Sequence, residues 1–250
     1  MSDAFSFYKY VDIRDALLII NNKTLMFTNP LEFNDPFDIA PVFPEVGLSK
    51  FHSRILQKQG QSHELFGRKR INYLKSMDFN ELRKKFLKSW GVTCFSKSPF
   101  ILPLWAHYAD NHKGCVLEFR VTEKMSNQIR DNNGILADIV YPLNVTYNKK
   151  RPKAYDENGV LTGKSAQNIL LTKDTAWAYE QEMRAFSDNS PGIHPFNKDQ
   201  LHRVYCGLKM EEDSIKQIES SVKNYQELYG KAVKVEQVHL DRNEYKMSKF

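Results

Sequence analysis

The order of its predicted elements is the feature of this chain that most constrains its fold. In some segments hydrophobic residues recur with a period of two, which is typical of strands. In others they recur with a period near 3.6, which is typical of helices, and the two kinds of segment alternate irregularly. Strands are predicted over residues 5–11, 23–28, 91–96, 115–121, 177–187, 203–208 and 233–240, with one or two more within 135–147. Helices are predicted after the first strand and over 48–90, 104–111, 164–176 and 211–229. Without a regular strand–helix–strand rhythm, the pattern favours an α+β fold with a central, mostly antiparallel, split sheet over a doubly wound one.

Length and composition predict one domain. A chain of 250 residues with 41% hydrophobic residues can bury a large core. No linker or internal repeat is visible, so residues 1–250 are expected to form a single domain, with residues 48–90 as a helical insertion. No apolar run approaches the ~18 residues of a membrane span, and the first residues lack the pattern of a secretory signal. Three cysteines without paired spacing indicate reduced thiols, so we expect a cytoplasmic protein with no membrane partner.

The positive charge of the chain is concentrated in one segment. The net charge is +6, and residues 50–90 alone carry eleven basic and three acidic side chains. Such a segment could attract nucleic acid or an anionic nucleotide. It could equally be the solvated face of amphipathic helices, and the sequence leaves both interpretations open.

Several common catalytic motifs are absent from the sequence. It contains no Gly-x-Gly-x-x-Gly and no Walker pattern, which disfavours kinase, P-loop and Rossmann functions. It also lacks His-Glu-x-x-His and Gly-x-Ser-x-Gly, the signatures of zinc proteases and of α/β-hydrolases.

The strongest candidate for a site is the row of charges within residues 177–187. If this segment is extended, Glu180, Glu182 and Arg184 share one face, with their Cα atoms about 7 Å apart from one to the next. Carboxylates beside a guanidinium are costly to bury, which makes the row a candidate for chemistry. The alternative is a ladder of salt bridges on a solvent-exposed sheet face.

A second candidate cluster lies within residues 104–114. Trp105 and Tyr108 are three residues apart and could form a wall on which a flat ring stacks, or they could belong to the core. His107 is a further candidate catalytic residue. His107 and His112 do not share a helix face, so a metal-binding pair is not expected.

Two further groups could supply polar atoms to a pocket. Asn34, Asp35 and Asp38 lie in a proline-rich turn, where Asn and Asp are also expected for purely structural reasons. Lys9 lies between two tyrosines in the first predicted strand and could meet a pyrophosphate or a carboxylate, or reach solvent.

Together these motifs resemble the bacterial family catalogued as domain of unknown function 2971. The resemblance covers nearly the whole chain, with its motifs in the same order. It rests on residues 8–10, 29–38, 105–114, 179–184 and 207–210.

A fainter resemblance suggests an activity. An aromatic strand, a short helix and a strand that ends in a polar turn are similar to the start of ADP-ribosyltransferase folds, and Glu180-x-Glu182 is similar to their Glu-x-Glu motif. The resemblance implies that Glu182 stabilises the oxocarbenium-like transition state of NAD cleavage, that Glu180 orients or activates the acceptor, and that Tyr10 or Tyr108 stacks on nicotinamide. Lys9 stands where such enzymes carry Arg or His.

These arguments together define a candidate site. The candidate catalytic residues are Glu182, Glu180 and His107, and no metal is expected. The candidate NAD-binding residues are Lys9, Tyr10, Asn34, Asp35, Trp105, Tyr108 and Arg184, with Lys9 or Arg184 holding phosphate.

Three functions remain open at this point. The leading hypothesis is an NAD-dependent ADP-ribosyltransferase-like enzyme, a bacterial toxin or phage-defence effector that modifies a protein or a nucleic acid through the basic segment 50–90. The second is a nucleic-acid hydrolase in which Asp35, Glu180 and Glu182 hold a divalent metal. The third is a non-catalytic binding module.

Overall fold

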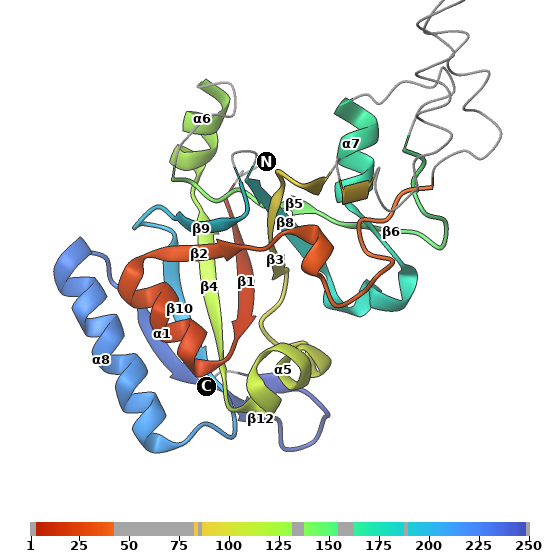
Figure 1. Cartoon of the computed structure of the whole chain (residues 1–250). Helices are drawn as coiled ribbons and strands as arrows, with labels where there is room; N and C mark the ends of the chain where they lie inside the picture. The colour runs from red at the N-terminus through yellow and green to blue at the C-terminus, as the bar shows by residue number, and fades with distance from the viewer. Residues whose placement is uncertain are drawn as a thin grey trace, which may run out of the picture.

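A central sheet of seven strands organises the chain (Figure 1). The computed structural model describes residues 4–42, 83–84, 87–131, 138–154, 163–187 and 190–248. The strand order is β11-β10-β4-β1-β3-β8-β5, and each neighbouring pair is antiparallel except β10 and β11. Its strands are β1 (Phe5–Val11), β3 (Gly91–Ser96), β4 (Cys115–Val121), β5 (Leu143–Asn144), β8 (Glu182–Ser187), β10 (Leu201–Cys206) and β11 (Lys234–Gln237). This arrangement confirms the α+β class and the mostly antiparallel sheet.

Helices and three small strand pairs surround the sheet. The helices are α1 (Ile13–Asn22), α5 (Leu102–Tyr108), α6 (Glu123–Asp131), α7 (Gly163–Leu170) and α8 (Glu212–Tyr229), with 3-10 turns η1 (Pro30–Glu32), η2 (Asp110–His112) and η3 (Thr175–Glu180). The small pairs join β2 (Thr24–Phe27) to β9 (Gly192–Pro195), β6 (Thr146–Tyr147) to β7 (Thr172–Lys173), and β12 (His239–Leu240) to β13 (Met247–Ser248). No helix in the described ranges is long and apolar enough to cross a bilayer.

The helices α1 and α8 cover one face of the sheet (Figure 1). Asp12 caps α1 by accepting a hydrogen bond of 2.7 Å from the backbone N–H of Asp15, which satisfies a donor that the first helical turn leaves free. Ala16 and Ile20 of α1 are buried there with Val222 of α8. These side chains pack on the alternate residues of β4 that face them, and they form the main core.

A smaller core covers the opposite face. Trp105 and Ala109, from α5 and the residue after it, pack there with Val116 of β4 and Tyr205 of β10. Successive residues of β4 thus enter different cores, because side chains alternate along a strand.

The sheet divides between β1 and β3. These two strands share only the register pair Tyr8 with Ser96, whereas β1 pairs with β4 along its whole length. Beyond the shared pair, Lys9 Nζ donates to Thr93 Oγ1 at 2.9 Å and to the Cys94 carbonyl oxygen at 3.2 Å. A side chain therefore replaces the backbone ladder between the strands, and the predicted split of the sheet is confirmed.

The structure corrects the sequence prediction before β8. Residues 175–180 form the 3-10 helix η3, and the strand begins at Glu182 rather than at residue 177. Asp174 starts η3 by accepting from the Ala176 N–H at 2.8 Å, and Gln181 ends it in the left-handed region at φ 49°. The helix predicted over 164–176 likewise ends at Leu170, because Thr172 and Lys173 pair with β6. The predicted helical insertion over 48–90 lies almost entirely outside the described residues.

Candidate functional site

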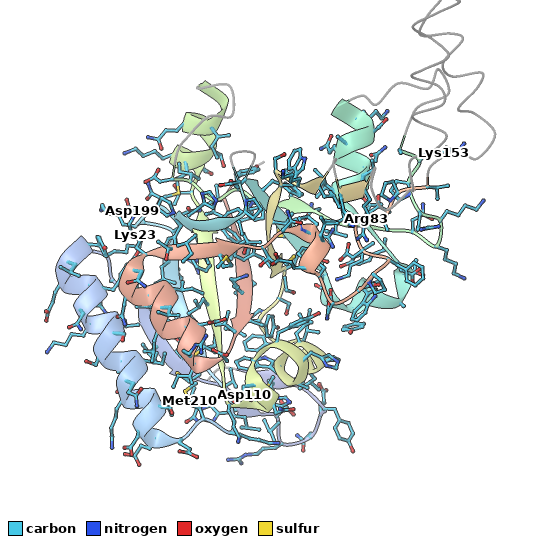
Figure 2. All side chains as sticks on the ribbon, in the orientation of Figure 1. Lys23, Arg83, Asp110, Lys153, Asp199 and Met210 are labelled. Atoms are coloured by element: carbon cyan, nitrogen blue, oxygen red, sulfur yellow. The ribbon has the colours of Figure 1, made fainter. Side chains whose placement is uncertain are left out.

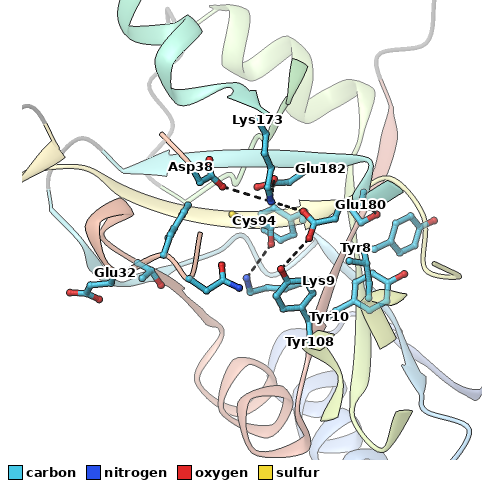
Figure 3. A pocket seen from close by; sticks show the side chains of 16 residues that line it. Tyr8, Lys9, Tyr10, Glu32, Asp38, Cys94, Tyr108, Lys173, Glu180 and Glu182 are labelled. Carbon is cyan, nitrogen blue, oxygen red and sulfur yellow. Dashed lines mark hydrogen bonds and ion pairs between the residues drawn. The ribbon is translucent and has the colours of Figure 1, made fainter. Parts of the chain in front are cut away.

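A cavity of about 300 Å³ opens where β1 and β3 separate (Figure 3). Strands β1, β3 and β8, helix α5 and the turn-rich segment after β2 contribute its walls. The side chains that can do chemistry there are Lys9, Tyr10, Asn34, Asp38, Cys94, Tyr108, Lys173, Glu180 and Glu182. Segments far apart in the sequence thus converge on one space.

Glu182 and Arg184 lie on the same face of β8, as its alternation predicts. Met183 and Ala185 point into the main core instead. Arg184 Nε donates to Glu182 Oε1 at 2.7 Å, and Arg184 Nη2 donates to Glu182 Oε2 at 3.1 Å. The side chain of Arg184 is fully buried, so the alternative of a solvent-exposed salt-bridge ladder is wrong.

Arg184 holds the carboxylates in place from behind the cavity. Its Nη2 donates to both carboxylate oxygens of Asp38, at 2.9 and 2.7 Å, and its Nη1 donates to the Leu170 carbonyl oxygen at 2.8 Å. Burial would lower the pKa of Arg184, but Glu182, Cys94 and Asp38 raise it above its ordinary value. The predicted role of Arg184 as a phosphate ligand does not fit this position, because the guanidinium does not line the cavity.

Lys173 is the residue that sequence reasoning missed. Its Nζ lies 2.6 Å from Glu180 Oε2, 2.9 Å from Glu182 Oε2 and 3.7 Å from Asp38 Oδ2 (Figure 3). One ammonium group therefore stands between three carboxylates. No pattern in the sequence marks this residue, which is one of thirty-six lysines and arginines and lies in a strand of only two residues.

The ion pairs keep Glu182 negatively charged. Burial would raise the pKa of this carboxyl, but Arg184 and Lys173 outweigh it and lower the pKa to about 2. Beside it, burial and the charge of Glu182 raise the pKa of the Cys94 thiol well above its usual range. The site thus presents a permanent carboxylate, while Cys94 stays a neutral thiol and is not suited to act as a nucleophile.

Glu180 connects this ion cluster to the cavity wall. Its Oε1 accepts a hydrogen bond of 3.1 Å from the Tyr108 hydroxyl, and its backbone carbonyl accepts from Ser96 Oγ at 2.7 Å. Burial and the charge of Glu180 both raise the pKa of Tyr108, so its hydroxyl remains a donor. The backbone N–H of Glu182 donates to the Tyr147 hydroxyl at 2.6 Å. Both glutamates are therefore held through their backbone as well as their side chains.

The aromatic residue Tyr10 is fixed by hydrogen bonds at its hydroxyl. That hydroxyl donates to the Ser98 carbonyl oxygen at 2.8 Å and accepts from the Ile101 N–H at 3.1 Å. Its ring packs edge-on against Trp105 at 5.6 Å between centroids. Tyr10 thus gives the cavity a rigid apolar wall.

Four predicted site residues lie outside this cavity. Trp105 is fully buried and donates from Nε1 to the Pro99 carbonyl oxygen at 2.8 Å, so the stacking wall expected from Trp105 and Tyr108 is wrong for Trp105. His107 is exposed on α5. Asp35 accepts from the Phe37 N–H at 2.8 Å in a turn and borders a second cavity. Arg184, as described above, supports the carboxylates.

A comparison with protein families matches the central part of the chain. Residues 104–185 match the family described as protein of unknown function (DUF2971). The match supports the resemblance stated from the sequence over this central part of the chain, whereas the motifs at residues 8–10, 29–38 and 207–210 lie outside it. The matched segment contains most of α5, β4, Lys173 and the row from Glu180 to Arg184. No curated protein and no solved structure gives a significant match to the chain.

Proposed function

We propose that this chain is an NAD-dependent ADP-ribosyltransferase-like enzyme. The observation that carries the proposal is Glu182, an ionised carboxylate held rigidly at a cavity in the split of the sheet, with Glu180 beside it. Cleavage of the bond between nicotinamide and ribose builds positive charge on the ribose. A fixed carboxylate stabilises that charge without reorganising during the reaction.

The remaining residues of the cavity suit the two parts of such a transfer, which are the departure of nicotinamide and the attack of the acceptor. Nicotinamide leaves with the electron pair of its bond to C1′ while an acceptor atom forms a new bond there and loses a proton. Glu180, between Lys173 and Tyr108, is placed to orient the acceptor or take that proton. Tyr10 and Tyr108 offer ring surface to nicotinamide, and half-buried Lys9 remains the candidate for a phosphate contact.

The size of the cavity sets which part of NAD it can hold. Small-molecule sites span about 300–1,000 Å³. At about 300 Å³ this cavity lies at the lower end of that range, which suits the nicotinamide–ribose half of the dinucleotide. From the resemblance of the sequence to ADP-ribosyltransferases, we extend the proposal to a bacterial toxin or a phage-defence effector.

The hydrolase alternative has weaker support from the geometry. Three carboxylates do gather, with Asp38 in the place expected for Asp35, but the Lys173 ammonium already occupies the space between them. A divalent cation would have to displace it. Within the described residues, no group of three His, Cys, Asp or Glu side chains is arranged to hold a metal ion.

The test is transfer of label from NAD to the macromolecules of a cell extract. We expect Glu182→Gln to lower transfer by about 10²–10³-fold, because it removes charge stabilisation at the reacting centre. Glu219→Gln, an exposed change of the same kind on α8, should keep full activity.

Glu182→Gln also disturbs the ion cluster. A second variant therefore tests the site with a smaller structural change. Tyr108→Phe deletes only the hydroxyl that contacts Glu180 and should lower transfer while the protein remains folded by circular dichroism. Full transfer by a folded Glu182→Gln protein would contradict the proposal. Loss of activity with a chelator would favour the hydrolase, and binding without turnover would favour the binding module.

A further inference from the structure

A second cavity, of about 640 Å³, adjoins the first. The two share Asn34 and Lys173 in their walls. The second cavity lies between the turn around Asp35, the loop after β6 and the segment from β7 into η3. A ligand that occupies it therefore reaches the edge of the carboxylate site.

One wall of this cavity is a row of cations. Lys149, Lys150 and Arg151 are all exposed, and none forms an ion pair with another described residue. Lys153 follows on the same loop, at the outer edge of the molecule (Figure 2). Exposed cations that pair with no acidic residue of the described part of the chain create a field that attracts anions.

The loop that carries the cations is anchored at both ends. Asn148 Oδ1 accepts from the Lys150 N–H at 2.9 Å, directly after β6. At the other end, the Val42 N–H donates to the Pro152 carbonyl oxygen at 2.8 Å, and the Ala154 N–H donates to the Val42 carbonyl oxygen at 2.9 Å. The backbone of the loop that carries the cations is thus held by hydrogen bonds before any ligand arrives.

The acidic residues of the cavity are already engaged with backbone. Asp35 accepts from the Phe37 N–H at 2.8 Å, and Asp174 accepts from the Ala176 N–H at 2.8 Å. These carboxylates hold turns and do not pair with the cationic row. The balance on the cavity wall therefore favours an anionic ligand.

Aromatic rings border the same cavity. Trp177 is partly exposed, with Lys173 Nζ 5.0 Å from its ring centroid, and Phe37 is 68% exposed. Aromatic faces beside a cationic track are the combination with which proteins bind single-stranded nucleic acids, stacking the bases and pairing with the phosphates.

We propose that the second cavity binds a single strand of nucleic acid, with successive phosphates at Lys149, Lys150 and Arg151 and a base stacked on Trp177. A row of consecutive cations suits a chain of phosphates better than the single pyrophosphate of a dinucleotide. The assignment of this strand as the acceptor of ADP-ribose rests on the proposed function, whereas its binding does not. In the transfer, an acceptor nucleophile of the strand bonds to C1′ and loses a proton as nicotinamide departs.

The test measures binding without NAD, so it does not depend on catalysis. Fluorescence anisotropy of labelled single-stranded DNA and RNA 12-mers is followed between 50 and 300 mM salt. The test variant combines Lys149→Gln, Lys150→Gln and Arg151→Gln. The control combines Lys124→Gln, Lys223→Gln and Lys234→Gln, three exposed lysines of α6, α8 and β11 that remove the same charge elsewhere.

The expected results differ for the cations and for the aromatic ring. The test variant should bind at least about tenfold more weakly, and its slope of log affinity against log salt should be shallower by about 2, since each lost phosphate contact removes about 0.7. The control should keep the slope of the parent. Trp177→Ala should weaken binding by roughly tenfold at every salt concentration, because stacking is not ionic.

Other outcomes would overturn the proposal. Equal binding by the test variant and the parent, or no binding of either strand by the parent, would do so. ADP is added at the concentration at which NAD saturates the protein. If ADP then displaces the strand, the second cavity binds the adenosine half of NAD and not a nucleic acid. If the test variant loses the strand and the parent cleaves no NAD, the strand site stands and the transferase proposal fails.

Discussion

At the scale of single residues, the candidate site depends on the neutralisation of three carboxylates by two cations. Lys173 and Arg184 share Asp38 and Glu182 between them, and of these two cations only Lys173 pairs with Glu180. Removal of one member of a buried ion cluster leaves its partners desolvated and unpaired. The cluster therefore fixes the geometry of the candidate site only while every member is present.

The variant Lys173→Met tests whether the stability of the protein depends on this ion cluster. We expect the free energy of unfolding at pH 7 to fall by about 3 kcal/mol, because the buried carboxylates lose their shared ammonium. Urea denaturation measures the loss. Lys216→Met, which removes a 61%-exposed lysine from α8, should cost less than ~1 kcal/mol. A similar small cost for Lys173→Met would show that the cluster is not stabilised through this residue.

The lowered pKa of Glu182 predicts how stability changes with pH. The folded pKa of about 2 lies below the ordinary value of 4.5, so the ionised group stabilises the protein above about pH 5. This contribution, about 3 kcal/mol, should be lost as the pH falls from 5 towards 2. Urea denaturation at pH 7 and pH 3 should show a smaller drop for Glu182→Gln than for the parent, while Glu219→Gln should match the parent.

At the scale of elements, the site depends on the contact between β3 and η3. Ser96 is buried, donates to the Glu180 carbonyl oxygen at 2.7 Å and lies opposite Glu182 in the register of β3 and β8. This hydroxyl holds the end of η3 against the sheet together with the Lys97 N–H, which donates to the Gln181 carbonyl oxygen at 3.0 Å. The position of Glu180 therefore follows from a strand that precedes it by more than eighty residues.

Ser96→Ala should loosen that contact without changing the fold. The orphaned carbonyl costs about 1–2 kcal/mol of the free energy of unfolding, and transfer from NAD should fall because Glu180 is less well positioned. Thermal unfolding and the labelled-NAD assay measure the two effects. Ser220→Ala, an exposed change on α8, should alter neither quantity. Unchanged transfer in a destabilised Ser96→Ala protein would exclude a positioning role for Ser96.

Sequence patterns predicted the regular elements better than the irregular ones. The shared face of Glu182 and Arg184 is a local property, readable from spacing alone. The 3-10 helix before β8 was missed because its start and end depend on single residues, Asp174 and Gln181, rather than on a periodic pattern. Lys173 could not be found because its importance arises only when the tertiary fold brings the distant Asp38 and the two nearby glutamates, Glu180 and Glu182, around it.

At the scale of the whole molecule, the junction between β1 and β3 links the first cavity to the stability of the fold. The strand groups β11-β10-β4-β1 and β3-β8-β5 meet at Tyr8 and Ser96 and through the side chain of Lys9. A ligand in the first cavity touches both groups, since Tyr10 belongs to one and Glu182 to the other. Binding should therefore stabilise the molecule as a unit.

NAD should accordingly raise the thermal unfolding midpoint of the whole chain. A ligand at one hundred times its dissociation constant adds about 2.7 kcal/mol, which corresponds to roughly 5–10 °C for a domain of this size. Differential scanning fluorimetry measures the shift. Glu182→Gln should retain most of it, because the proposed role of the carboxylate is to stabilise the transition state more than the bound substrate. Lys9→Met should reduce it by removing the candidate phosphate contact. A midpoint that NAD leaves unchanged while ADP raises it would place nucleotide binding in the second cavity and remove NAD from the first.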